Sequence, residues 1–169
     1  DKSAKAAEEH TIVGARLNER NQAEAAQRRA AESALRKGEG VFQQLFESMP
    51  DPVISVNREG AIVRINSRAE QVFGYHREEM LGQPVEMLIP GRFRDRHVGL
   101  RGTYMAGPKI RPMGAGLDLF GRRKDGSEFA VEISLSPMET EEGLFAVSVV
   151  RDVTAQKEAQ KALQELSDE

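Results

Sequence analysis

Residues 117–137 read LDLFGRRKDGSEFAVEISLSP, and this stretch predicts two β-strands joined by a tight turn. The segment Lys124-Asp125-Gly126 supplies the turn between two twisted strands. After the turn, apolar side chains alternate with polar ones, which is the period of a strand with one buried face. The apolar series is Phe129, Val131, Ile133 and Leu135. We therefore expect strands over residues 115–123 and 128–137.

Further strand patterns precede and follow this hairpin. A β run at 53–56, the turn Asn57-Arg58-Glu59-Gly60 and a run at 61–65 predict an earlier hairpin, and residues 144–153 predict a last strand. Between the two groups, helical segments are expected at 67–73, 77–81, 85–88 and 92–105, the first of them capped by Asn66 or Ser67. This order predicts an α+β fold, in which a five-stranded antiparallel sheet carries short helices on one face.

Polar, alanine-rich helices are expected on both sides of this sheet domain. Strong helix formers dominate residues 2–37, and Gly38 and Gly40 are expected to separate that helix from a short amphipathic one that ends at Pro50. Residues 155–166 predict a final helix with a thin apolar stripe. A helix this polar buries little surface alone, so we expect a coiled-coil-like homodimer with a second copy of the chain.

The chain therefore divides into a helical linker (1–40), a sheet domain (41–153) and a C-terminal helix (154–169). The formal net charge of −3 provides no broad basic field for nucleic acid. Cysteine is absent, which excludes disulfides, thiolate catalysis and covalent thioether cofactors. The longest apolar stretch, 144–150, is too short to span a bilayer, so we expect a cytoplasmic module whose parent protein carries any membrane anchor in other segments.

The residue pattern also argues against an enzyme. The histidines have no evident nucleophile partner, and neither a Gly-x-Ser-x-Gly elbow nor a Walker-type phosphate loop is present. Glu8, Glu9 and His10 are adjacent and would lie on different faces of a helix, which disfavours a metal site. We expect a regulatory domain, with any catalytic activity in the remainder of the parent protein.

Several short motifs, in order, resemble the PAS family. They are Met49-Pro50-Asp51-Pro52-Val53, Asn57-Arg58-Glu59-Gly60, Ile65-Asn66-Ser67-Arg68-Ala69-Glu70, Phe73-Gly74-Tyr75, Glu78-Glu79-Met80-Leu81-Gly82, Leu88-Ile89-Pro90, Arg122-Arg123-Lys124-Asp125-Gly126-Ser127 and Arg151-Asp152-Val153-Thr154. The resemblance implies a sensory and dimerising module of a bacterial signalling protein, such as a histidine kinase of a two-component system or a cyclic-di-nucleotide enzyme. It also implies that Asp152, Val153 and Thr154 carry the signal from the sheet into the last helix.

The helix expected over residues 92–105 carries a histidine on an apolar face. That face comprises Phe93, His97, Leu100 and Tyr104. A neutral imidazole in such a place can bind iron. The stretch Arg96-His97, followed by the Lys124-Asp125-Gly126 turn, is similar to the heme-containing PAS domains of the FixL and DosP type. Aligned from that turn, His97 falls on their proximal ligand, so the resemblance implies heme with His97 as the axial ligand of the iron.

Two positions depart from that subgroup. The arginine that hydrogen-bonds bound oxygen in those sensors is replaced by Leu117, and the methionine ligand of the DosP type falls on Ala115, near Met113. An apolar distal side would favour CO, NO or redox sensing over stable oxygen binding. Its members would be Leu117, Ile133 and Leu135, while Arg101, Lys109 and Arg111 are candidate partners of the heme propionates. With His97, Tyr104 and Met113, these residues form the predicted cofactor site.

Two alternatives to heme remain at this point. One is a small organic ligand or metabolite in the cleft of the domain. The other is a ligand-free core, with the domain acting only as a protein-interaction joint and His97 as a packed or surface histidine.

Overall fold

The expected hairpin is present in the computed structural model, which describes residues 1–113 and 118–168. Its strands are β4 (Leu119–Arg122) and β5 (Glu128–Thr140), with Leu119 opposite Val131. Gly126 has a φ of 87° in the turn between them, and its amide donates a hydrogen bond of 3.0 Å to the Arg123 carbonyl. Residues 115–117 of the predicted first strand lie outside the described residues.

The predicted antiparallel sheet is confirmed. Its other strands are β1 (Val53–Val56), β2 (Ile62–Ile65), β3 (Arg111–Pro112) and β6 (Gly143–Asp152). The strand order is β2-β1-β6-β5-β3, and β4 also pairs with β5. β3 and β4 pair with different stretches of β5, so together they form one edge of the sheet. The six strands therefore occupy five positions across the sheet, which is the predicted number.

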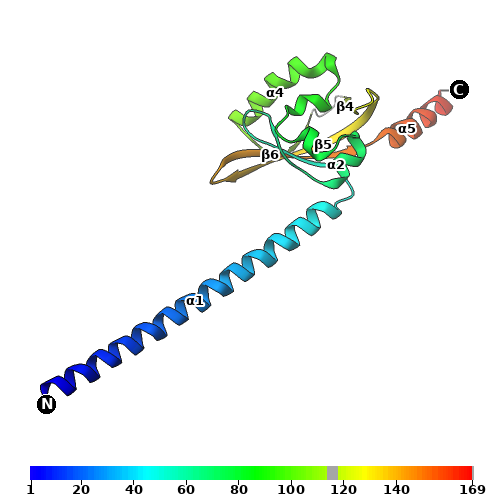
Figure 1. Cartoon of the computed structure of the whole chain (residues 1–169). Helices are drawn as coiled ribbons and strands as arrows, with labels where there is room; N and C mark the ends of the chain where they lie inside the picture. The colour runs from blue at the N-terminus through cyan, green and yellow to red at the C-terminus, as the bar shows by residue number, and fades with distance from the viewer. Residues whose placement is uncertain (114–117, 169) are drawn as a thin grey trace. The chain divides into compact units, whose positions relative to one another are not determined.

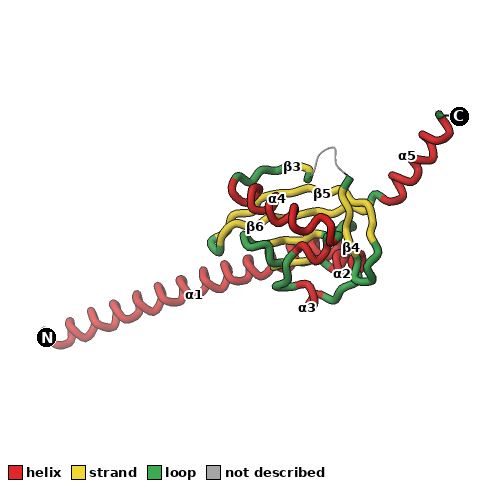
Figure 2. Tube along the Cα trace, turned by 90° about the horizontal axis from the view of Figure 1, so that it is seen from above, coloured by secondary structure: helices red, strands yellow, loops and turns green. Residues whose placement is uncertain are grey.

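The predicted short helices lie between the two hairpins. They are α2 (Ser67–Phe73), α3 (Arg77–Met80), the 3₁₀ turns η1 (Val85–Leu88) and η2 (Gly91–Phe93), and α4 (Arg94–Ala106). Figure 1 and Figure 2 show α4 lying across one face of the sheet. Residues 92–105 were expected to form one helix, and instead η2 turns the chain before α4 begins.

The core is formed where these helices meet the sheet. The Phe73 ring at the end of α2 packs against the Phe129 ring of β5, with 5.5 Å between centroids. Gly121 lies opposite Phe129 in the ladder, and a Cβ there would come within 2.8 Å of that ring. The β4–β5 register is regular. Gly121 therefore permits a close approach of the Phe129 ring to the backbone of β4.

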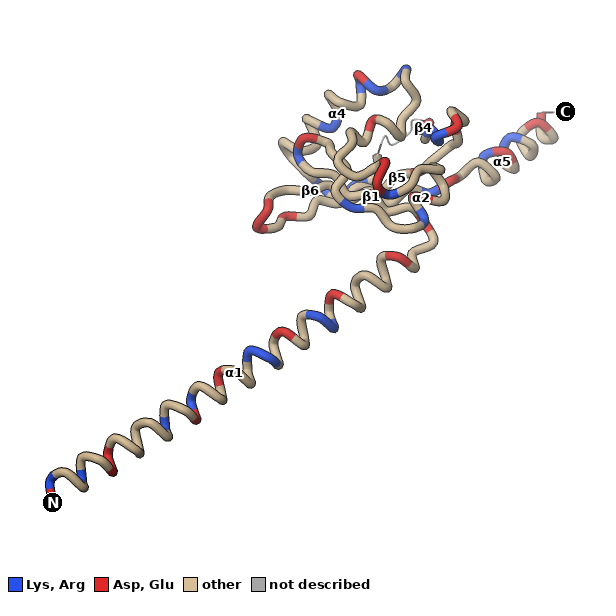
Figure 3. The backbone as a smooth tube through the Cα atoms, viewed as in Figure 1, with Lys and Arg blue, Asp and Glu red and all other residues tan. Residues whose placement is uncertain are grey.

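The N-terminal segment forms one continuous helix, α1 (Lys2–Ser48), where two were expected. Gly38 and Gly40 do not end it, because each glycine costs only about 1 kcal/mol in a helix of otherwise strong helix formers. Charges of both signs follow one another along α1 (Figure 3), and pairs such as Arg20–Glu24, at 2.9 Å, join successive turns. The chain divides within this helix into two units, Asp1–Leu45 and Phe46–Glu169.

Asn66 joins three segments of the second unit. Its side chain is fully buried, and its Oδ1 accepts hydrogen bonds from the amides of Val53 in β1 (2.9 Å) and Ala69 in α2 (3.1 Å). Its Nδ2 donates to the carbonyls of Asp51 (3.0 Å) and Phe46 (3.3 Å). Asn66 is therefore both the expected N-cap of α2 and the attachment point for the end of α1.

Glu47 makes a second attachment beside Asn66. Its carboxylate accepts hydrogen bonds from the amide of Ser67, at 2.7 Å, and from the Ser67 hydroxyl. The Arg77 guanidinium of α3 lies 3.0 Å from Glu47 and 3.4 Å from Glu70. The first turn of α2 thus receives a negative charge from another element, which stabilises the positive end of the helix dipole.

The last helix, α5 (Thr154–Ser167), begins directly after β6. The N-cap residue is Val153, and the Thr154 amide donates a hydrogen bond of 3.0 Å to the carboxylate of Asp152, the residue before it. Leu163 and Leu166 are exposed on this helix. Among the helices of the described residues, none is both long and apolar enough to cross a bilayer.

Replacing Asn66 by alanine should lower the free energy of unfolding by about 2–4 kcal/mol, because it leaves several buried backbone groups without partners. Denaturant unfolding of the purified chain measures this. The matched control is Asn21→Ala, at an exposed position of α1, which should change stability by no more than about 0.5 kcal/mol. Equal effects of the two substitutions would contradict the role assigned to Asn66.

The Glu47→Gln variant should be less stable than the native chain at neutral pH, by an amount that shrinks on acidification. Burial alone would raise the pKa of Glu47, but the hydrogen bonds from Ser67 and the charge of Arg77 hold it below the ordinary value of 4.5. A carboxyl with a lowered folded-state pKa stabilises fully above its unfolded pKa, and this is lost as the pH falls through the folded value. A stability difference unchanged between about pH 7 and about pH 3 would refute this linkage.

Candidate ligand-binding site

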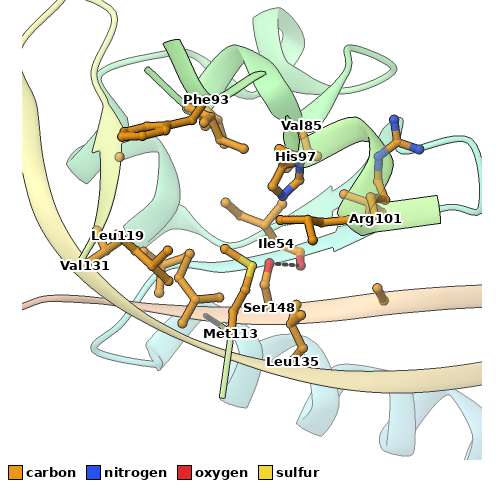
Figure 4. Close-up of a pocket in the computed structure, with 18 of the residues that line it drawn as sticks. Ile54, Val85, Phe93, His97, Arg101, Met113, Leu119, Val131, Leu135 and Ser148 are labelled. Carbon is orange, nitrogen blue, oxygen red and sulfur yellow. Dashed lines mark hydrogen bonds between the residues drawn. The ribbon is translucent and has the colours of Figure 1, made fainter. Parts of the chain in front are cut away.

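A cavity of about 400 Å³ lies between the helices and the inner face of the sheet (Figure 4). Such a volume falls in the range of pockets that bind small organic ligands and cofactors. Most of the sheet side of the lining comes from three neighbouring strands, whose contribution is almost wholly apolar. These residues are Ile54 and Val56 of β1, Val131, Ile133 and Leu135 of β5, and Ala146, Ser148 and Val150 of β6, and β4 adds Leu119, Phe120 and Gly121.

Strand alternation explains why this face is apolar. In β6, residues 146, 148 and 150 face the cavity, and each residue between them points to the opposite face of the sheet. The single hydroxyl in this series, that of Ser148, is satisfied within the sheet, because it donates a hydrogen bond of 3.1 Å to the Ile54 carbonyl. The floor of the cavity therefore offers apolar contact to a ligand and almost no polar contact.

The helical side of the cavity contains the predicted apolar face. Phe93, His97, Leu100 and Tyr104 all line it. Figure 4 shows the His97 side chain directed from α4 toward the strands. The His97 side chain is 18% exposed, and Tyr104 is buried, with its hydroxyl donating a hydrogen bond of 2.9 Å to the Lys109 carbonyl. The helical spacing thus correctly placed this histidine beside the interior cavity.

His97 is held by a buried carboxylate from another element. Its Nδ1 lies 3.0 Å from Oε1 of Glu86 in η1, and the Nε of Arg101 donates to the same oxygen at 2.9 Å. Glu86 is 7% exposed, and the Arg101 side chain is 15% exposed. One carboxylate oxygen therefore serves both an imidazole and a guanidinium at the wall of the cavity.

The charge on Glu86 is stabilised where it lies. Burial alone would raise the pKa of Glu86, but the hydrogen bonds from His97 and Arg101 outweigh it and lower the pKa below its ordinary value. The guanidinium is in turn accommodated by Gly60 at the β1–β2 turn, where a Cβ would overlap Arg101. Gly60 also has a φ of 84°, and its carbonyl accepts a hydrogen bond of 2.9 Å from the Val85 amide.

Cationic side chains lie at other points of the lining. Arg96 and Arg111 both contribute to it and are exposed. The Arg111 guanidinium lies 5.3 Å from the centre of the Tyr104 ring. Asp118 also lines the cavity, and its carboxylate accepts a hydrogen bond from Lys157 of α5. The cavity is thus apolar inside and bears both signs of charge where side chains reach solvent.

The structure brings most of the predicted site residues together. His97, Arg101, Tyr104, Arg111, Met113, Ile133 and Leu135 all line the one cavity, whereas Leu117 lies outside the described residues. Their part in binding a cofactor stays a prediction. Arg101, expected at a propionate, is already bound to Glu86, and Lys109 does not appear in the lining.

Sequence reasoning missed Glu86. Its neighbours in the chain predict only a short helical turn, and its partners lie 11 and 15 residues further on. A single acidic residue within the apolar stretch Val85-Glu86-Met87-Leu88 could have been noticed, because a charge in such a place is expected to have a partner.

The predicted relay residues lie at the end of β6. Val153 is buried, and its amide donates a hydrogen bond of 3.0 Å to the Ala130 carbonyl of β5. Asp152 lies 3.5 Å from the Arg123 guanidinium, whose Nε donates to the Val72 carbonyl at the end of α2. The residues just before α5 are therefore hydrogen-bonded to the sheet, and they are linked to α2 through Arg123.

No group of three or more His, Asp or Glu side chains that could hold a metal ion occurs within the described part of the chain. Within the lining, His97 could supply one ligand to a metal.

Comparison with known proteins agrees with this architecture. The sequence profile of the PAS fold matches residues 41–153. The chain is 31% identical over 138 residues to the sensor protein FixL of Bradyrhizobium diazoefficiens, covering 82% of this chain and 27% of that protein. It is 30% identical over 128 residues to the oxygen sensor protein DosP of Escherichia coli, covering 74% and 16%. It thus spans about a quarter or less of these relatives.

Solved structures show the same fold. The PAS domain of an HTR-like protein from Haloarcula marismortui superposes with a TM-score of 0.61 at 24% identity, covering 73% of this chain and 98% of that one. An RNA-binding light-oxygen-voltage receptor superposes with a TM-score of 0.63 at 19% identity, covering 78% and 37%. The sheet order, the helices on one face and the matched sequence profile lead to one conclusion: this chain belongs to the PAS family and carries a sensory PAS domain.

Proposed function

We propose that this PAS domain binds heme in its cavity, with His97 as the axial ligand, and relays the state of that site through its flanking helices. The observation that carries the proposal is the imidazole of His97 at an apolar cavity, with its Nδ1 held by a buried carboxylate. A histidine that ligates a metal usually donates its other ring nitrogen to such a group. The sequence similarity to the oxygen sensor DosP adds support.

The residues present fit this cofactor. A heme supplies four of the iron ligands itself, so one histidine from the chain is sufficient, and an apolar cavity suits its ring. Bound there, the group would supply binding of diatomic gases and a change of oxidation state. Arg96 and Arg111 could bind its carboxylates, which leaves Arg101 with Glu86.

The apolar side chains on the inner face of β5 bear on which gas or redox change the domain would detect. Ile133 and Leu135 line the cavity and have no hydrogen-bond donor on their side chains. A stable oxygen complex gains from such a donor, whereas CO, NO and redox change depend on it less. We therefore propose a redox, CO or NO signal for this domain.

Hemin added to the purified domain should give a Soret absorbance band, and His97→Ala should abolish that band or shift it strongly, because the axial nitrogen is lost. Absorbance spectra of both oxidation states measure this. His10→Ala, on α1 and outside the cavity, is the matched control and should retain the native spectrum. No Soret band in the native protein, or an identical band in His97→Ala, would rule out the proposed site. The first result would favour a small organic ligand or a ligand-free joint.

The connection between cavity and output lies in β6. This strand lines the cavity with residues 146, 148 and 150, and only two residues later it reaches Asp152 and the start of α5. Asp118 of the lining is also bonded to Lys157 of α5. A shift of the sheet on ligand binding would therefore reach α5 within a few residues. The effector would lie elsewhere in the parent chain, and the similarity to the histidine kinase AtoS, at 26% identity, favours a kinase.

The end of α1 supports a homodimer. Leu35, Phe42 and Leu45 are exposed and recur at heptad positions a, a and d, with Gly38 at the d position between Leu35 and Phe42. Such a short stripe is self-complementary, so a second copy of the same helix is the simplest partner.

The double substitution Leu35→Glu/Leu45→Glu should weaken the dimer about 10–100-fold, because it places charge in the helix–helix contact. Sedimentation at several concentrations measures the dissociation constant. Arg36→Glu, at the b position on the opposite face, should have little effect. A native chain that remains monomeric at the highest concentration, or a double variant that dimerises as well as the native chain, would contradict this model of assembly.

A further inference from the structure

Glu86 lies behind His97, which lines the cavity on its helical side. It lies on η1 and is 7% exposed, and its Oε1 lies 3.0 Å from Nδ1 of His97. A neutral imidazole carries a proton on only one ring nitrogen. Since an ionised carboxylate can only accept, the geometry requires that proton to be on Nδ1 whenever His97 is neutral.

Arg101 stabilises the ionised carboxylate of Glu86 beside His97. Its Nε donates to the same Oε1 at 2.9 Å, and a guanidinium does not lose its proton in proteins. The guanidinium lies against the β1–β2 turn, where Gly60 leaves the space that a Cβ would fill. The glycine thus gives the cation room to lie beside Glu86.

We propose that Glu86, held by Arg101, is a positioning residue that fixes His97 as the Nδ1–H tautomer and so presents its Nε2 lone pair to the cavity. This inference depends on the proposed function only where it names heme as the ligand of His97. The tautomer itself is a property of the ligand-free chain. In a metal complex, the same carboxylate would increase electron donation by the imidazole, and so favour the more oxidised iron.

The first test needs no cofactor. In the ligand-free protein, long-range ¹H–¹⁵N NMR of the imidazole ring should show the proton of His97 on Nδ1 and an unprotonated Nε2. In Glu86→Gln, the amide can either accept or donate, so the preference should be reduced or lost. Glu132→Gln, an exposed residue of β5, is the matched control and should leave the His97 signals unchanged. A native His97 protonated on Nε2 would overturn the proposal.

The second test uses hemin-loaded protein and the rate of heme transfer to an excess of apomyoglobin. Glu86→Gln should lose heme about 10–100-fold faster than the native protein, the usual effect of removing such a partner, and its reduction potential should rise. Glu132→Gln should match the native protein in both. Native retention and native potential in Glu86→Gln would overturn the proposal while leaving heme binding intact.

Because Glu86→Gln leaves a poorly exposed cation beside His97, this variant could fail to fold. The pair Arg101→Gln and Glu86→Gln/Arg101→Gln avoids that difficulty, since neither leaves the guanidinium without its carboxylate. The double variant should lose heme faster than Arg101→Gln, and equal rates would overturn the proposal. If the native protein takes up no hemin at all, the proposed function fails, and the NMR test still decides the role of Glu86.

Discussion

The arrangement of this domain depends on the buried side chain of Asn66. A single amide group serves four backbone partners, on α1, the residues before β1, β1 itself and α2. Buried backbone groups need partners, and this amide provides them just where regular structure is interrupted. The end of α1, the first strand and the first short helix are thereby fixed to one another.

Much of the fold was predictable because its local patterns are strong. The alternation after Lys124-Asp125-Gly126 defined a strand with one buried face, and the structure places that face on the cavity. Asn66 was recognisable as a helix cap from its position, but its contacts with Phe46 and Asp51 were not, because they join distant parts of the chain. Glycine was a less reliable guide, because Gly38 and Gly40 do not end the helix that they were expected to end.

The candidate site was predictable in part for the same reason. Helical periodicity placed His97 on the buried side of α4, and strand periodicity placed Ile133 and Leu135 across from it. The partners of the polar groups were not predictable. Glu86 and Arg101 meet across two elements whose relative position no local pattern specifies. The assignment of Arg101 to a ligand's carboxylate therefore overlooked an internal carboxylate that is nearer.

Gly60 looks like an ordinary turn residue, but two separate demands act on it. Its backbone is left-handed, and the space beside it is filled by the guanidinium that holds Glu86. The first demand comes from the hairpin and the second from the cavity. A Cβ at this position would require the side chain of Arg101, 41 positions further along the chain, to shift. A smaller side chain at position 101 would remove the steric conflict but would leave the left-handed backbone at position 60 unchanged. Asparagine tolerates that conformation better than most residues, so among related sequences we expect Asn at position 60 to occur together with a smaller residue at position 101.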